Sequence, residues 1–152
     1  VYKRQIQEVW NELAQKEPNA PDIKFELESE ENTVESDRSF FVIMVGSILE
    51  NAIHFYRPRN TDSLVKVKVK RNEQGQYAIS VFDNGMGIAV EVASKIFDMF
   101  VVGTQDAKGT GIGLYEAQVI AERLKGKVWL KDFGHYLTEF EIILPSQYDT
   151  VL

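Results

Sequence analysis

The chain has 152 residues, and its 17 Lys and Arg against 23 Asp and Glu give a formal net charge of −6. This length is typical of one domain, and 44% hydrophobic with 26% charged residues indicates a globular protein rather than a disordered or fibrous one. The sequence contains no Cys, which excludes disulfides, thiolate zinc sites, iron–sulfur clusters and a Cys nucleophile. With only two His and a net acidic charge, the chain is a poor candidate for a His-rich metal site or for a nucleic-acid partner.

The sequence predicts no membrane span and no signal peptide. The longest uncharged stretch, residues 39–49, is shorter than the roughly 18 apolar residues that a span needs, and no apolar segment follows the first basic residues. We therefore expect a cytoplasmic location without membrane contact by this segment. The opening VYKRQ resembles the translated end of a transposon used in sequencing libraries, so the domain is predicted over residues 6–146, with a tail at 147–152.

The first part of the chain predicts helix, strand and helix. Apolar residues spaced three and four apart between residues 6 and 13 predict a helix that ends before Pro18. Alternation of apolar and polar residues over 23–27 predicts a strand. A second helix is predicted from about Ser36 to Pro58, and its apolar residues are so dense that most of its circumference should be buried.

The second part of the chain predicts two hairpins. Residues 64–71, LVKVKVKR, alternate Val with Lys, which is typical of a strand with one solvated face, and residues 76–83 predict its partner. A short helix near residues 90–97, a third long helix beginning within GTGIGL, and strands at 127–132 and 137–144 follow. Hairpins covered by three long helices predict an α+β fold, a two-layer sandwich whose mixed, mostly antiparallel sheet carries the helices on one face.

A polar motif, ENA, interrupts the most apolar helix at residues 50–52. A buried amide without a partner costs on the order of 1–3 kcal/mol, so the Asn51 side chain must bind something. One interpretation is a hydrogen bond to the backbone or to a water. The other is that its amide oxygen binds Mg²⁺, a hard cation that takes oxygen ligands and accompanies phosphates.

A second motif, FDNGMGIA, begins where a strand is predicted to end. Asp83 closes that strand, and Gly85 and Gly87 follow at alternate positions. The triplet DNG on its own is a common turn between a strand and a helix. A carboxylate at a strand end can instead accept a hydrogen bond from an adenine amino group, with glycines that let the base lie close to the backbone.

A third motif, GTGIGL at residues 109–114, leads directly into the third long helix. Exposed N–H groups and the positive end of the helix dipole favour an anion there, and glycines let the chain wrap a phosphate. GxxxxGK[ST] is absent, and the segment follows a loop rather than the strand that precedes a dinucleotide-binding GxGxxG. The alternative is a helix start that only needs a flexible entry.

Taken together, the three motifs resemble the ATP-binding fold shared by sensor histidine kinases, type II topoisomerases, large heat-shock chaperones and mismatch-repair ATPases. Within this group the sequence is most similar to the catalytic domain of bacterial histidine kinases. Three further segments carry the resemblance: KIFDMF at 95–100, LKGKVWL at 124–130 and TEFEIILP at 138–145. The resemblance covers about residues 6–146.

The resemblance implies that each motif contributes to binding Mg-ATP. Asn51 would bind Mg²⁺, and Asp83 would bind the adenine amino group with help from Thr138 through a water. Gly85 and Gly87 would line the base pocket. The phosphates would contact a group of residues that ends the loop and begins the third helix: Lys108, Gly109, Thr110, Gly111, Gly113 and Leu114. The loop itself, residues 98–108, would be a lid that gates nucleotide entry and is anchored by Phe97 and Phe100.

Three residues depart from the pattern of histidine kinases. Ser47 lies one helical turn before Asn51, where these kinases usually have a second Asn and the hydrolysing relatives have Glu. His54 stands in place of a Lys, as a weaker positive partner for phosphate, and Val102 in place of a phosphate-contacting Arg. Because Ser is a poor general base, the resemblance implies phosphoryl transfer rather than efficient hydrolysis.

The phosphoryl acceptor would be a His on an upstream dimerisation hairpin, because neither His54 nor His135 fits that role. A receiver domain of a response regulator would then take the phosphoryl group. No residue of this chain is assigned as catalytic. Two alternatives stay open: a degenerate nucleotide-binding or interaction module without kinase activity, and a stand-alone kinase that phosphorylates Ser on an anti-sigma-factor antagonist.

Overall fold

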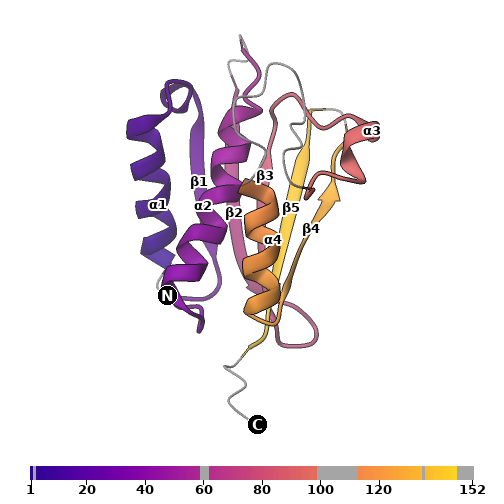
Figure 1. Cartoon of the computed structure of the whole chain (residues 1–152). Coiled ribbons are helices and arrows are strands. Elements are labelled where there is room, and N and C mark those ends of the chain that lie inside the picture. The colour runs from indigo at the N-terminus through magenta and orange to yellow at the C-terminus, as the bar shows by residue number, and fades with distance from the viewer. Residues whose placement is uncertain (2, 59–61, 99–112, 135, 147–152) are drawn as a thin grey trace.

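The structure is a computed structural model that describes residues 1, 3–58, 62–98, 113–134 and 136–146. Segments from both ends of the chain contribute strands to one sheet and helices that cover it (Figure 1). The elements are α1 (Lys3–Lys16), the 3₁₀ helix η1 (Ala20–Asp22), β1 (Lys24–Ser29), α2 (Arg38–His54), β2 (Leu64–Arg71), β3 (Tyr77–Asp83), α3 (Val90–Ala93), α4 (Gly113–Arg123), β4 (Lys127–Asp132) and β5 (Thr138–Leu144).

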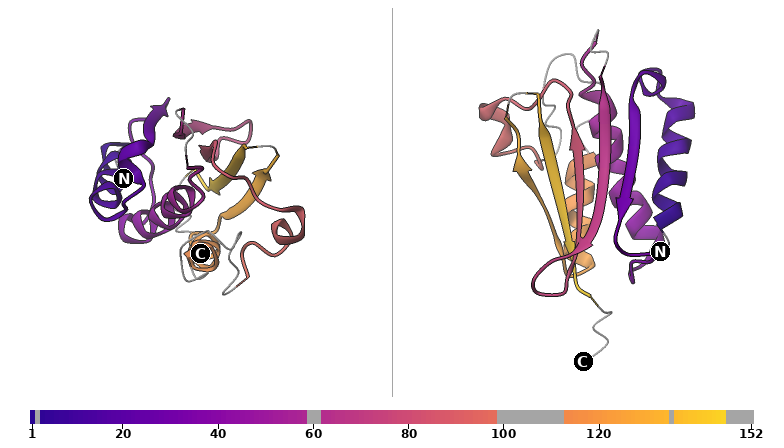
Figure 2. Two further views of the ribbon diagram at one scale, coloured as in Figure 1. Left: turned by 90° about the horizontal axis from the view of Figure 1, so that it is seen from above. Right: turned by 180° about the vertical axis from the view of Figure 1, so that it is seen from behind.

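The five strands form one mixed sheet in the order β1-β2-β3-β5-β4. β1 runs parallel to β2 and is joined to it through α2, while the other neighbouring strands are antiparallel. Helices α1, α2 and α4 lie against one face of the sheet, and the view from behind shows the opposite face without a covering helix (Figure 2). The predicted two-layer α+β sandwich is therefore confirmed.

The strand sequences fix which face is buried. Apolar side chains at alternate positions point toward the helices, because successive residues of a strand face opposite sides of the sheet. In the central strands this inner row contains Val65, Val67 and Val69 of β2, Tyr77, Ile79 and Val81 of β3, and Phe140, Ile142 and Leu144 of β5, all buried. The row of β3 continues, in the same phase, to Asp83.

The outer face of the sheet carries the Lys row that the sequence predicts to be solvated. The Lys66 and Lys68 ammonium groups lie 3.8 Å and 3.4 Å from carboxylate oxygens of Glu28 on the neighbouring strand. Exposed pairs of this kind contribute about 0–1 kcal/mol each. The row is therefore explained as a solvated, charge-paired surface.

Helix α2 lies at the centre of the helical layer and is buried on most sides, as predicted. The Asp37 side chain caps its first turn by accepting a hydrogen bond from the Phe40 amide at 2.9 Å. The predicted end at Pro58 is wrong, because α2 ends at His54. Beyond it the Phe55 carbonyl accepts a hydrogen bond from the Met86 amide at 2.8 Å, which joins the end of α2 to the loop after β3.

Three smaller features complete the fold. Residues 3–5, left out of the predicted domain, form the first turn of α1, and the Gln5 side chain is buried. Helix α3 is shorter than predicted, because tight turns over residues 92–98 follow its last residue, Ala93. Among the described residues, no helix combines the length and the apolar character that crossing a bilayer needs.

Candidate functional site

The Asp83 carboxyl group is an acid in a row of core residues. It closes β3, keeps the inward phase of that strand, and is only 4% exposed. Its neighbours across the sheet are Val65 on β2 and Thr138 on β5. The Asp83 and Thr138 side chains, 55 positions apart in the sequence, are thereby brought together beneath the C-terminal end of α2.

Burial makes the ionised form of this carboxyl group costly. Desolvation raises the pKa of Asp83 from 3.8 to about 7, and the Gly85 amide, which donates a hydrogen bond to Asp83 Oδ1 at 3.0 Å, lowers it by a smaller amount. No cation compensates the charge among the described residues, since no described ion pair includes Asp83. An underpaired acceptor of this kind suits a neutral ligand that donates a hydrogen bond.

The loop after Asp83 passes close to other backbone on two sides, and each glycine of the motif avoids a different close contact. A Cβ on Gly85 would lie 2.2 Å from the Phe55 carbonyl oxygen, so any side chain would displace the loop from the end of α2. Gly87 has φ +77°, and its Cβ would lie 3.4 Å from the Gly134 carbonyl oxygen in the β4–β5 connection. The glycines therefore let the loop pass between α2 and this connection.

Three buried side-chain atoms in the described part of the chain have no hydrogen-bond partner: Asn51 Nδ2, Arg57 Nε and Thr138 Oγ1. Asn51 lies in the last turn of α2, Arg57 follows the end of that helix, and Thr138 pairs with Asp83. Unpaired buried polar atoms are rare in folded proteins, and each costs about 1–3 kcal/mol. Two of these residues, Arg57 and Thr138, lie near Asp83, which indicates that a polar ligand could bind there.

Arg57 is the residue of this site that sequence reasoning did not place. It lines one pocket with Ala52, Tyr56, Asp83 and Gly85. No periodicity or motif marks it, because it lies in an irregular segment whose course depends on the contact between Phe55 and the loop after β3. The unpaired Nε atom is a signal that only the fold reveals.

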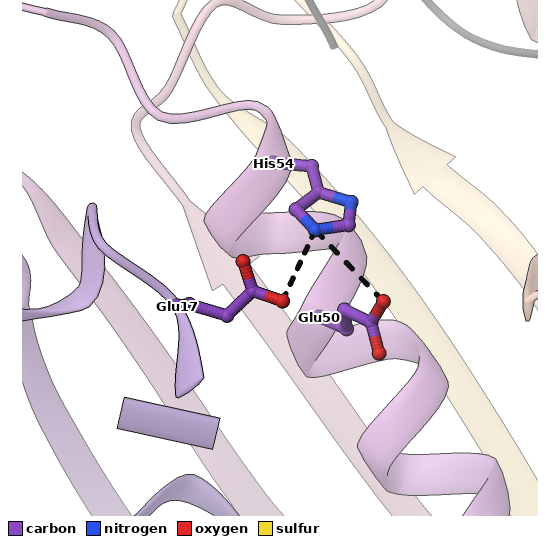
Figure 3. Close-up of side chains that lie close together, drawn as sticks. All are labelled: Glu17, Glu50 and His54. Atoms are coloured by element: carbon purple, nitrogen blue, oxygen red, sulfur yellow. Dashed lines mark hydrogen bonds and ion pairs between the residues drawn. The ribbon is translucent and has the colours of Figure 1, made fainter. Parts of the chain in front are cut away.

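His54 lies beside two carboxylates, those of Glu17, which follows the last residue of α1, and of Glu50, one turn earlier in α2. Its Nε2 lies 3.4 Å from Glu17 Oε1 and 3.8 Å from Glu50 Oε1, and Figure 3 shows the two carboxylates converging on the ring. These three groups lie close enough together to share a cation. A protonated His54 would already be neutralised by these acids, so its contact with a phosphate stays a prediction.

The start of α4 lies beside α2. A Cβ on Gly113 would lie 3.8 Å from the Ser47 Cβ, one helical turn before Asn51, and Leu114 is buried in the core. Ser47 Oγ donates a hydrogen bond to the Ile43 carbonyl at 2.9 Å. The end of the GTGIGL motif is thus brought to the same helix as Asn51.

The other predicted phosphate contacts, Lys108, Gly109, Thr110 and Gly111, lie outside the described residues, as do Phe100 and Val102. Of the predicted lid anchors, Phe97 is described, and its ring meets the Phe140 ring edge-on at 5.9 Å between centroids. The residues predicted to bind the base, Asp83, Gly85, Gly87 and Thr138, are therefore all among the described residues, whereas most of those predicted to bind the phosphates are not.

The model of one protein family, described as "Histidine kinase-, DNA gyrase B-, and HSP90-like ATPase", matches residues 36–148. The chain belongs to this ATPase family. The matched range holds all three sequence motifs, so the resemblance stated from the motifs is confirmed. Because the family is described as ATPases, ATP is the ligand to consider for the polar groups around Asp83.

The curated relatives and solved structures compared here, to which this chain is similar, are histidine kinases. The signal transduction histidine-protein kinase AtoS of Escherichia coli K12 is 32% identical over 120 residues, which are 79% of this chain and 19% of AtoS. The mycobacterial sensor histidine kinase MprB has the same fold, with a TM-score of 0.77 over 95% of both chains at 22% identity. ShkA, solved full-length in complex with AMPPNP, gives 0.73 over 94% of this chain and 29% of that one at 20% identity. The chain thus spans about a fifth of the length of AtoS.

Proposed function

We propose that the chain is the catalytic domain of a two-component sensor histidine kinase, which binds Mg-ATP and transfers the γ-phosphoryl group to a His on a separate dimerisation hairpin. A receiver domain of a response regulator would take the group next. The single observation that supports this most is the buried Asp83 carboxylate, which forms no ion pair within the described part of the chain and pairs across the sheet with Thr138, whose hydroxyl is unpaired there, in a family described as ATPases. Such a domain works on the cytoplasmic side of a membrane, where ATP is supplied.

The adenine end of the nucleotide would be bound at the end of β3. The Asp83 carboxylate accepts a hydrogen bond from the adenine amino group, and the Thr138 hydroxyl binds a water that bridges to the same carboxylate or to the base. Gly85 and Gly87 would keep the loop between the end of α2 and the β4–β5 connection, beside the base, since a side chain at either position would meet backbone there. Binding would thereby satisfy two polar groups that the free domain leaves underpaired.

The phosphate end would lie toward the start of α4. The Asn51 side chain fits a Mg²⁺ ion through its amide oxygen, which is a hard ligand, while its Nδ2, unpaired among the described residues, is a donor that a phosphate oxygen could accept from. The Mg²⁺ ion would neutralise phosphate charge during transfer. Residues 109–113 would supply backbone N–H groups at the helix N-terminus, which the buried Leu114 anchors in the core, and Lys108 would add a positive charge.

The residues near Asn51 support transfer to an outside acceptor. Ser47 cannot easily take a proton from water, because its hydroxyl is weakly basic and its own proton is donated to the Ile43 carbonyl. His54 lies between Glu17 and Glu50 and is unsuited as the acceptor. We therefore propose that the acceptor His belongs to another segment of the protein.

One observation favours the second candidate function, a nucleotide-binding module without kinase activity. The ring of His54 is engaged by two carboxylates and adds little net positive charge for the phosphates. The Ser-kinase alternative receives no such support, because the relatives that match are named sensor kinases.

A transfer assay distinguishes the two functions. The chain is mixed with Mg²⁺, [γ-³²P]ATP and a purified His-bearing dimerisation hairpin, and acid-labile, base-stable label on the hairpin is measured. Label that disappears in the Asp83→Asn variant supports the kinase. Tight ATP binding by calorimetry without any label on the hairpin of the same protein supports the module, and absence of ATP binding contradicts both functions.

A further inference from the structure

Three side chains of metal-binding type lie together where the end of α1 meets the last turn of α2. Glu50 and His54 are four positions apart in α2, so their side chains leave the helix on the same side. Glu17 is the residue that follows α1. Figure 3 shows the imidazole ring and both carboxylates directed toward one another. One ligand atom from each residue lies within 4.8 Å of the other two, which is close enough to share an ion.

The fold holds the backbone of this cluster in place. The Glu17 amide donates a hydrogen bond to the Leu13 carbonyl at 2.9 Å, and the Glu17 carbonyl accepts one from the Ala20 amide at 3.2 Å. His54 ends α2 between two buried neighbours, and its own side chain is 13% exposed. The Glu50 side chain is 47% exposed and can adjust its position. The cluster is therefore fixed on its inner side and open to water at Glu50.

The two carboxylates of the cluster lack a full counter-charge. In the ranges of the chain that the structure describes, no Lys or Arg forms an ion pair with Glu17 or Glu50, and His54 is the basic partner of both. A His side chain changes its charge near neutral pH, so one imidazole supplies at most one positive charge to two carboxylates. A divalent cation held by two carboxylates and a neutral imidazole would balance these charges.

The distances within the cluster suit a shared metal ion better than direct hydrogen bonds. An N–H···O hydrogen bond usually spans about 2.7–3.2 Å between its N and O atoms. His54 Nε2 lies 3.4 Å from Glu17 Oε1 and 3.8 Å from Glu50 Oε1. Two ligand atoms at about 2.1 Å from a tetrahedral Zn²⁺ ion are themselves about 3.4 Å apart. The pair of His54 and Glu17 has this spacing, and a small rotation of the half-exposed Glu50 side chain would bring its oxygen to the same spacing.

We propose that Glu17, Glu50 and His54 form a site for a divalent transition metal such as Zn²⁺, in addition to the Mg²⁺ site proposed at Asn51. An imidazole nitrogen favours Zn²⁺, Ni²⁺ or Co²⁺, whereas Mg²⁺ prefers six oxygen ligands and keeps several waters. A water at the open side would complete the four ligands that are usual for Zn²⁺. The bound ion would link the end of α1 to the last turn of α2 and so stabilise the folded chain. This inference does not depend on the proposed function.

Titration of the untagged chain with Zn²⁺, without nucleotide, tests this inference. Calorimetry should show a single ion bound per chain, and the melting temperature should rise with Zn²⁺ but not with Mg²⁺ at the same concentration. We expect His54→Ala and Glu17→Gln each to weaken Zn²⁺ binding at least roughly 10- to 100-fold, because losing a residue that only orients a metal ligand already costs this much. His135→Ala removes the only other His of the chain and is the matched control, which should bind Zn²⁺ as the wild type does.

Several results would overturn the metal site. A wild type that binds no Zn²⁺, or that binds Mg²⁺ equally well, would do so. Unchanged Zn²⁺ binding in His54→Ala and Glu17→Gln, or its loss in His135→Ala, would place the ion elsewhere and overturn it as well. Should either cluster variant fail to fold, as judged by circular dichroism, Glu50→Gln at the exposed side provides the same comparison. Because ATP binding is measured separately, with Mg²⁺ and without Zn²⁺, the metal site and the proposed function can each fail alone.

Discussion

Replacing Asp83 by Asn should stabilise the folded domain and abolish its binding of ATP. The carboxyl group has a pKa of about 7 in the folded chain against its ordinary value of 3.8, and the cause is desolvation by burial. Its ionisation therefore opposes folding, and stability is lost as pH rises between these two values. The slope is about 1.4 kcal/mol per pH unit, which gives roughly 4 kcal/mol in total above pH 7. Asn has no such titration and keeps an oxygen for the Gly85 amide.

Urea unfolding without nucleotide at pH 4, 6 and 8 measures this effect. The free energy of unfolding of Asp83→Asn relative to wild type should be near zero at pH 4 and should grow in favour of the variant by several kcal/mol at pH 8. The exposed residue Asp22 provides a matched control, since Asp22→Asn should show no growing difference. A variant at position 83 that is destabilised at pH 8, or whose advantage does not change with pH, would refute the reasoning. At pH 8 ATP should raise the melting temperature of the wild type and not of Asp83→Asn.

Three further predictions follow from the same site. ATP affinity of the wild type should fall about tenfold per pH unit below pH 7, because binding needs the ionised form of Asp83. Calorimetry at pH 5.5 to 8 measures this dependence, and an affinity that does not change with pH would contradict it. Asn51→Ala should lose roughly 10-fold or more in affinity for Mg-ATP but little for ATP in EDTA, so equal losses in both titrations would contradict a metal contact. Gly85→Ala should destabilise the domain by about 2 kcal/mol or more, which is the size of an overpacking change in a core. Gly46→Ala, whose Cβ would meet Val9 at an ordinary 3.5 Å, should not destabilise it. Similar melting temperatures for the two variants would argue against the close approach of Gly85 to Phe55.

The fold was predictable because strand and helix periods are strong in this sequence. The alternation that marks β2 and β3 also fixes their inward phase, and this phase continues to Asp83. Which strand lies beside β3 was not predictable, since a C-terminal hairpin could pair with either edge of the sheet. The meeting of Asp83 with Thr138 depends on β5 pairing with β3, a long-range choice made by packing rather than by any local pattern.

The parts of the site that sequence did not reveal depend on long-range contacts. Helix α2 ends at His54, and the Phe55 carbonyl then accepts a hydrogen bond from the Met86 amide. Met86 is far from Phe55 in the sequence, so no local pattern predicts this contact. The same holds for His54 and Glu17, which meet only because α1 packs against α2. Arg57 acquires its place from this early helix end. The motifs therefore predicted the residues of the family pattern, and the structure added neighbours, such as Arg57 and Glu17, that no motif indicates.

A crystal structure of the chain with Mg²⁺ and AMPPNP tests the central claim most directly. The account predicts the adenine amino group within about 3.2 Å of an Asp83 carboxylate oxygen, and the Asn51 amide oxygen on the Mg²⁺ ion at the phosphates. A nucleotide bound elsewhere, or one whose base leaves Asp83 without a contact, would contradict it.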